Sequence, residues 1–214
     1  MTAQPVGKLI VAVGLPCSGK SSVMGALGSM INAQVFLEPE EKEWGKAVLQ
    51  WDQACHFTGL MWFRSARVPL LREADRVRAS GGVALVDSYY DKLIAHYLAR
   101  PGMEWLLSPN DPYFELAMGV ARTDWRILPD ADSIVTFEVE PADWRAMLAR
   151  RNRALDRDEA FSKSYETQRY FIEAAMHLAA ERNIRIVHFR QTFGTVEDAA
   201  ERLLASLREA GILP

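Results

Sequence analysis

The sequence predicts an α/β fold, in which a five-stranded parallel sheet lies between two layers of helices in a three-layer sandwich. Three observations support this prediction. Short apolar segments rich in β-branched residues are typical of strands that are buried on both faces of a parallel sheet. These segments alternate with longer ones that have helical periodicity. The chain has 214 residues, of which 49% are hydrophobic and 25% are charged, so we expect a single domain over residues 1–214.

The first predicted unit is a strand, a helix and a second strand. Residues 9–13 are continuously apolar, and this run stops at Gly14. Apolar residues then recur at helical spacing over residues 21–31, and residues 34–37 have the pattern of another short strand. This order is the βαβ unit, whose crossover is expected to be right-handed.

The remaining elements follow the same alternation. Helical periodicity extends from about residue 44 to 78, although Gly59 and Pro69 predict a break or kink within it. Further strands are expected at residues 83–86, 133–137 and 184–189. Further helices are expected at residues 89–99, 113–121, 141–150, 158–181 and 196–207.

A phosphate-binding motif stands directly after the first strand. Residues 14–21 read GLPCSGKS and fit the pattern G-x-x-x-x-G-K-[ST] of a P-loop. In such a loop the backbone N–H groups surround phosphate oxygens, the lysine reaches the β and γ phosphates, and the hydroxyl binds Mg²⁺. The motif predicts ATP and Mg²⁺ as cofactors, with the metal at Ser21. The expected nucleotide-binding residues are Gly14, Pro16, Cys17, Ser18, Gly19, Lys20, Ser21 and Ser22.

Two carboxylates follow the next two predicted strands. Glu38 comes after the second strand and Asp87 directly after the third. Ligands bind at the carboxyl ends of the strands in such sheets. Glu38 is therefore a candidate general base for an acceptor hydroxyl, and Asp87 is a candidate for holding Mg²⁺, its water or a sugar hydroxyl. The alternative for each is a helix-capping or surface carboxylate.

An arginine cluster at about residues 150–159 predicts a lid. Phosphoryl transfer places negative charge on equatorial oxygens, which mobile arginines stabilise. The candidate catalytic residues are therefore Lys20, Glu38, Asp87, Arg150, Arg153 and Arg157. The alternative for the cluster is a solvated basic surface paired with neighbouring acidic residues.

At these residues the chain resembles the deoxynucleoside kinase and thymidylate kinase branch of the P-loop kinases. Residues 36–44 read FLEPEEKEW, which is similar to the E-P-x-x-x-W segment of deoxynucleoside kinases with one residue more before the tryptophan. Residues 153–159 read RALDRDE, which is similar to the R-x-L-D-R-x-E lid of bacterial thymidylate kinases. The resemblance implies that Glu38 activates the sugar 5′-hydroxyl of a nucleoside.

The chain also departs from that pattern. Residues 86–89 read VDSY, so Ser88 occupies the position of the arginine in the D-R pair, which contacts acceptor or phosphate oxygens in both families. The glutamine that reads the base in deoxynucleoside kinases has no clear counterpart, and Thr58 lies nearest to its expected place. Arg64 and Arg67, one helical turn apart, are candidates to replace some of the missing positive charge.

Composition excludes several classes of partner and location. The net charge of −3 provides no basic surface for nucleic acid. Two cysteines are too few for a disulfide framework, and no predicted segment has the length of a membrane span or the pattern of a signal peptide. We therefore expect a cytoplasmic protein that binds neither nucleic acid nor a membrane.

Together these features predict an ATP-dependent kinase, a phosphotransferase that moves the γ-phosphoryl group to a deoxynucleoside or, less favoured, to a nucleoside monophosphate. The partner is then a small-molecule substrate. One alternative is a P-loop kinase of another small hydroxylated metabolite, such as an antibiotic or a sugar. Another is a non-catalytic nucleotide-binding regulator. The resemblance also implies a homodimer, for which residues 44–78 are the expected contact.

Overall fold

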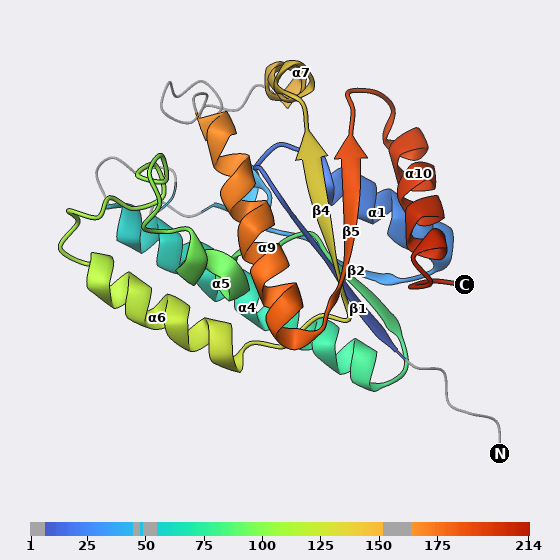
Figure 1. Cartoon of the computed structure of the whole chain (residues 1–214), viewed down its shortest axis with the longest axis horizontal. Helices are drawn as coiled ribbons and strands as arrows, with labels where there is room; N and C mark the ends of the chain where they lie inside the picture. Colours follow the sequence, from blue (N-terminus) through green and yellow to red (C-terminus); the bar gives the residue numbers. More distant parts are fainter. Residues whose placement is uncertain (1–6, 45–47, 49–54, 152–163) are drawn as a thin grey trace.

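A parallel five-stranded sheet forms the centre of the computed structural model, which describes residues 7–44, 48, 55–151 and 164–214 (Figure 1). The strand order is β2-β3-β1-β4-β5, and each neighbouring pair is parallel. The predicted sheet is therefore confirmed, with strand ends that differ by one or two residues. The strands are β1 (Lys8–Gly14), β2 (Gln34–Phe36), β3 (Val83–Val86), β4 (Ser133–Val139) and β5 (Arg185–Gln191).

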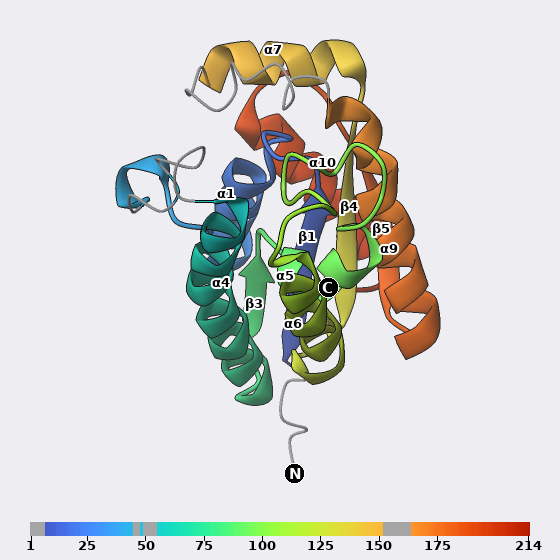
Figure 2. The ribbon, with the colours of Figure 1, turned by 90° about the vertical axis from the view of Figure 1, so that its left-hand side faces the viewer.

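Helices cover both faces of this sheet and produce the predicted three layers. Helices α1 and α10 lie on one face, and α4, α5, α6 and α9 lie on the other (Figures 1 and 2). The helices are α1 (Lys20–Ile31), α4 (His56–Ala79), α5 (Tyr90–Leu93), α6 (Phe114–Ile127), α7 (Pro141–Arg151), α9 (Gln168–Arg182) and α10 (Val196–Glu209). Short 3₁₀ helices are η1 (Glu41–Glu43), η2 (Ile94–His96) and η4 (Ser164–Thr167).

The central strand β1 explains why this part of the sequence is apolar without alternation. Leu9 and Val11 belong to the core that α4, α5, α6 and α9 cover, whereas Ile10 and Ala12 belong to the core under α1 and α10. All four side chains have no exposed surface. A strand in the middle of a covered sheet needs apolar side chains on both faces.

Several helix boundaries differ from the predicted ones. Helix α4 begins at His56 and continues through Gly59 and Pro69, so neither residue ends it. Burial of Leu71 and Ala74 against the sheet outweighs the one hydrogen bond that the proline removes. Helix α6 continues six residues beyond its predicted end, to Ile127.

Residues 89–99 form only the short helices α5 and η2 rather than one helix. The tighter turn brings Tyr97 into the core, where its hydroxyl donates to the carbonyl oxygen of Tyr90 (3.2 Å). Residues 158–163 of the helix predicted at residues 158–181 lie outside the described residues, and α9 begins at Gln168.

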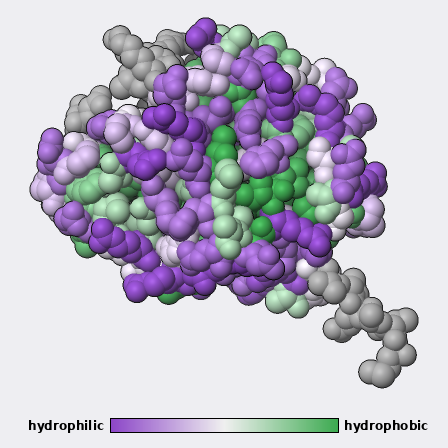
Figure 3. All heavy atoms as spheres, in the orientation of Figure 1, coloured by the Kyte–Doolittle hydropathy of each residue, from purple (hydrophilic) through white to green (hydrophobic). Residues whose placement is uncertain are grey.

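The surface in Figure 3 is mostly hydrophilic, with hydrophobic residues visible around the edge strand β5 and in a second area at the left of the view. In the described part of the chain, every helix is too short or too polar to cross a bilayer.

Candidate active site

The P-loop connects β1 to α1, as the motif predicts. Gly14 ends β1 beside β4, and a Cβ atom placed there would lie 2.6 Å from the carbonyl oxygen of Phe137. Gly19 precedes α1 with a φ of 81°, in the left-handed region that favours glycine. Both glycines of the motif are therefore required by the backbone, and the loop opens at the N-terminus of α1, where a phosphate is stabilised.

Lys20 lies buried inside this loop. Its Nζ donates to the carbonyl oxygens of Gly14 (3.1 Å) and Leu15 (2.7 Å). Burial lowers the pKa of Lys20 to about 8, although the negative charges of Glu38 and Asp87 partly oppose this shift. The ammonium group therefore lies inside the P-loop of residues 14–21, called the phosphate cradle below, where a bound phosphate would stabilise the charged form of the lysine.

A tryptophan of helix α7 also holds the P-loop in place. The side chain of Trp144 is 1% exposed, and its Nε1 donates to the carbonyl oxygen of Pro16 (2.9 Å). Tyr90 provides a second contact, because its hydroxyl donates to the carbonyl oxygen of Gly14 (2.7 Å). These two aromatic residues hold the cradle in position without entering the motif, and neither is recognisable from the spacing of the motif.

Glu38 and Asp87 come together where β2 and β3 end, as predicted. The backbone N–H of Glu38 donates to Oδ1 of Asp87 (3.0 Å), and the backbone N–H of Asp87 donates to the carbonyl oxygen of Phe36 (3.2 Å). Asp87 is only 2% exposed, whereas the side chain of Glu38 is 29% exposed. Glu38 therefore lines the open pocket, whereas Asp87 is buried and is not among the lining residues.

The residues around Asp87 fit a divalent cation. Burial, followed by the charge of Glu38, raises the pKa of Asp87 to about 7, while the Ser21 hydroxyl and Lys20 lower it. Its Oδ2 atom is buried and has no hydrogen-bond partner within the described part of the chain. A hydroxyl and an orphaned carboxylate oxygen are ligands that Mg²⁺ prefers.

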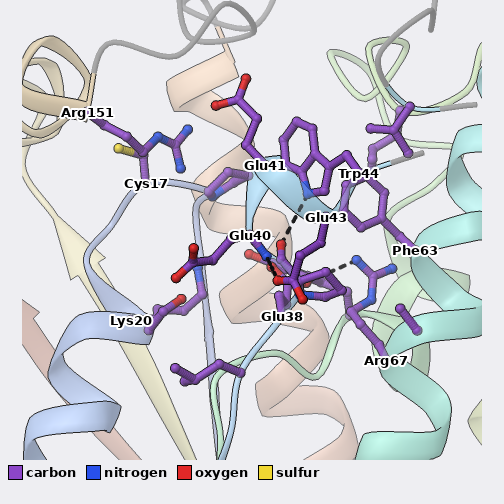
Figure 4. A pocket seen from close by; sticks show the side chains of 18 of the residues that line it. Cys17, Lys20, Glu38, Glu40, Glu41, Glu43, Trp44, Phe63, Arg67 and Arg151 are labelled. Atoms are coloured by element: carbon purple, nitrogen blue, oxygen red, sulfur yellow. Dashed lines mark hydrogen bonds and ion pairs between the residues drawn. The ribbon is translucent and has the colours of Figure 1, made fainter. Parts of the chain in front are cut away.

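A cavity of about 1340 Å³ is lined by Lys20, Ser21 and Glu38. Figure 4 shows Glu38 between Lys20 on one side and Arg67 on the other. The donor side is lined by the P-loop and by Arg150 and Arg151 of α7. The opposite side is lined by α4 and by the segment of Glu40, Glu41 and Glu43.

Arg67 is a site residue whose partners the sequence pattern did not indicate. Its Nη1 donates to Oε1 of Glu38 (3.1 Å), and its Nε and Nη2 bind Asp91. Arg64, one turn earlier, instead binds Asp124 of α6 (2.7 Å from Nη2 to Oδ1) and does not line the cavity. Only one of the two candidate arginines therefore brings positive charge to the site.

Comparison with models of known families gives no match, and comparison with curated protein sequences gives none. Solved structures do match. Deoxyadenosine kinase from M. mycoides with bound dATP superposes with a TM-score of 0.66 at 13% identity, over 94% of this chain and 99% of that one. Thymidylate kinase from Ehrlichia chaffeensis superposes with a TM-score of 0.55 at 14% identity, over 95% and 100% of the two chains. The fold is that of the deoxynucleoside and thymidylate kinases.

The lid expected for this kinase fold falls largely on residues that the structure does not describe. Arg153 and Arg157 lie outside the described residues. Arg150 stands in the last turn of α7 and lines the cavity. Its guanidinium stacks on Phe193 (4.8 Å from Cζ to the ring centre), and Nη1 donates to the carbonyl oxygen of Gly194 (3.4 Å). The role of the arginine cluster therefore stays a prediction.

Proposed function

We propose that the chain is an ATP-dependent kinase that transfers the γ-phosphoryl group to a hydroxyl group of a nucleoside or deoxynucleoside. One observation carries this proposal: a P-loop lysine and an accessible carboxylate, Lys20 and Glu38, line the same cavity (Figure 4). A nucleotide-binding protein needs only the first group, whereas a kinase also needs an accessible base for the acceptor hydroxyl. The kinase fold of the solved neighbours supports the same reading.

In the proposed reaction, Glu38 accepts the proton of the acceptor hydroxyl. The freed oxygen attacks the γ-phosphorus, and the bond between that phosphorus and the bridging oxygen of ADP breaks, so ADP leaves with the electron pair. Lys20 and the loop N–H groups stabilise the charge on the donor phosphates. Arg150, Arg153 and Arg157 are proposed to stabilise the equatorial oxygens in the transition state.

Mg²⁺ is proposed to be held by Ser21 and Asp87, where it would neutralise phosphate charge when bound. The orphaned Oδ2 of Asp87 supports this assignment.

The charges on the acceptor side favour a nucleoside over a nucleoside monophosphate. Arg67 is already engaged by Glu38 and Asp91, and Lys42 pairs with Glu40 (2.7 Å). An acceptor phosphate would therefore meet several carboxylates and no unengaged cation among the described residues of that side. Placing a negative phosphate beside these carboxylates costs electrostatic energy, so a nucleoside monophosphate should bind more weakly than the nucleoside.

A coupled assay with nucleosides and nucleoside monophosphates tests the proposal. We expect transfer to at least one nucleoside and slower transfer to the matching monophosphate. Glu38→Gln should lower kcat by about 10²–10⁴-fold, because it removes the base, and should leave the Kd for ATP unchanged at pH 6.5. The absence of transfer to every nucleoside, with ATP bound normally, would refute the acceptor assignment. Full turnover in Glu38→Gln would refute the base.

A second candidate is a kinase of another small hydroxylated metabolite, and Ser88 favours it, because the arginine of the related D-R pairs is absent there. Thermal shifts with nucleosides, sugars and amino sugars, each with a non-hydrolysable ATP analogue, separate the two candidates. If a sugar stabilises the protein and no nucleoside does, the sugar replaces the nucleoside as the proposed acceptor. Nucleotide binding without transfer to any acceptor would indicate a regulator.

The remaining proposals concern context. We propose that the chain acts on small molecules in the cytoplasm and that it forms a homodimer, for which the exposed part of α4, within the expected contact of residues 44–78, is the surface to test.

A further inference from the structure

Arg67 is the centre of a row of three charged side chains that ends at the proposed base. Its guanidinium fork grips Asp91 of α5, with Nε 2.7 Å from Oδ2 and Nη2 3.1 Å from Oδ1. Its Nη1 lies 3.1 Å from Oε1 of Glu38. The side chains of Arg67 and Asp91 are 11% and 7% exposed, so the row runs from the interior to the open pocket.

Two aromatic rings hold the same guanidinium. Its Cζ lies 5.4 Å from the centre of the Phe63 ring and 5.5 Å from the centre of the Tyr90 ring, distances at which a cation is attracted to a ring face. Burial lowers the pKa of Arg67, but the charges of Asp91 and Glu38 raise it more, so the pKa lies above its ordinary value. The cation is therefore permanent and held from several sides.

We infer that Arg67 is a positioning residue for Glu38, and that Asp91 holds Arg67 in place. The inference rests on the proposed function. Glu38 stands in the segment after β2, where nothing in the backbone fixes its long side chain in one rotamer. The ion pair engages Oε1 and leaves Oε2 to accept a proton. A base must be held within a fraction of an ångström of its target, and a displacement of 1 Å lowers a rate by about 10²-fold.

The guanidinium beside Glu38 comes from α4, and position 88 is a serine. The end of β3 carries no cation beside Glu38, because Ser88 occupies that place in the sequence. Helix α4 supplies the guanidinium from the opposite side instead, and Asp91, four residues after Asp87, anchors it. The base and its positioning residue thus come from separate elements.

A purely structural ion pair is the alternative, and the same helix provides its control. Arg64 also forms a two-pronged pair with a buried carboxylate, that of Asp124, whose side chain is 1% exposed. That pair lies outside the cavity. Arg64→Gln and Arg67→Gln therefore each remove a two-pronged ion pair with a buried aspartate, but only Arg67→Gln also removes a contact with Glu38.

The experiment compares kcat, the KM for ATP and the thermal midpoint of these two variants with the wild type. We expect Arg67→Gln to lower kcat by about 10- to 100-fold, as misplacement of a base does, and to leave the KM for ATP within twofold. Arg64→Gln should lower the thermal midpoint but keep kcat within twofold. Arg67→Lys, which keeps the charge but loses the fork, should recover part of kcat only.

A double-mutant cycle with Glu38→Gln decides the mechanism. If Arg67 acts through Glu38, Arg67→Gln changes kcat by less than about twofold once Glu38→Gln is present. Independent, multiplying losses would overturn the inference, and so would unchanged kcat in Arg67→Gln. If Arg67→Gln does not fold, the same cycle is run with Arg67→Lys. A wild type that transfers phosphate to no acceptor refutes the proposed function and removes the inference with it, whereas an active wild type with multiplying losses refutes the inference alone.

Discussion

Asp87→Asn should stabilise the ligand-free protein increasingly as the pH rises from 5 to 7. The ordinary pKa of the carboxyl is 3.8, and burial together with the charge of Glu38 raises it to about 7 in the folded state. Between these values the folded protein keeps a proton that the unfolded chain has released. Stability therefore falls as pH rises through this interval, by about 1.4 kcal/mol per pH unit where the difference is one full proton.

The magnitude follows from that slope. The slope flattens as the pH approaches 7, so the wild type should lose about 2 kcal/mol of Asp87-linked stability between pH 5 and pH 7. Asparagine does not titrate, and its carbonyl oxygen can still accept the N–H of Glu38. All other groups titrate in both proteins. The difference in unfolding free energy between variant and wild type therefore reports the titration of Asp87 together with the effect of its charge on Lys20.

The assay is urea unfolding with EDTA and without nucleotide, at half-unit steps from pH 5 to pH 7. Lys20 of the wild type has a pKa of about 8, and Asp87→Asn removes one of the charges that raise it, so the series stops at pH 7, below the pKa of Lys20 in the wild type. We expect the unfolding free energy of the variant minus that of the wild type to increase by about 2 kcal/mol from pH 5 to pH 7, whatever its value at pH 5. A difference that does not change with pH would refute the argument that burial keeps the carboxyl of Asp87 protonated in this range.

Three further predictions concern the phosphate cradle. Because the charged form of Lys20 binds phosphate, the affinity for metal-free ATP should fall above pH 8, and calorimetry in buffers of different ionisation enthalpy should detect proton uptake near pH 8.5. Trp144→Phe removes the donor to Pro16 and should reduce stability by about 1–3 kcal/mol in urea unfolding; an unchanged midpoint contradicts this. Gly14→Ala should destabilise by at least about 2 kcal/mol, whereas Gly25→Ala in α1, where a Cβ meets nothing within 4 Å, should be neutral or stabilising.

The parts of the site that could be predicted are those determined by neighbours in the sequence. The P-loop is one such part, because its turn, its lysine and its helix N-terminus occupy consecutive residues. Glu38 and Asp87 are another, because a residue that follows a parallel strand lies at the carboxyl edge of the sheet. Only the order of the elements is needed to bring these groups together.

Arg67 and Asp91 could not be assigned in this way. Arg64 and Arg67 are three positions apart, about 60° around the helix, and the sequence pattern does not distinguish their roles. Their roles separate only when α4 packs, because one then faces α6 and the other faces Glu38 and Asp91. The contact of Trp144 with the P-loop likewise joins residues 128 positions apart. Such contacts depend on the rotation of packed helices, which periodicity does not determine.

The coupling between the two sides of the cavity also sets the conditions for testing Glu38. Burial lowers the pKa of Lys20, and the charge of Glu38 is the first of the effects that raise it again. Glu38→Gln removes that charge, so the pKa of Lys20 should fall further below about 8. At pH 8 the variant would then bind ATP more weakly because its lysine is neutral, even though Glu38 does not touch the donor. At pH 6.5 this effect is much smaller, so the Kd for ATP should be close to that of the wild type. Equal weakening at both pH values would mean that Glu38 contributes to the ATP site directly, and a loss confined to kcat at pH 6.5 would assign it to the acceptor.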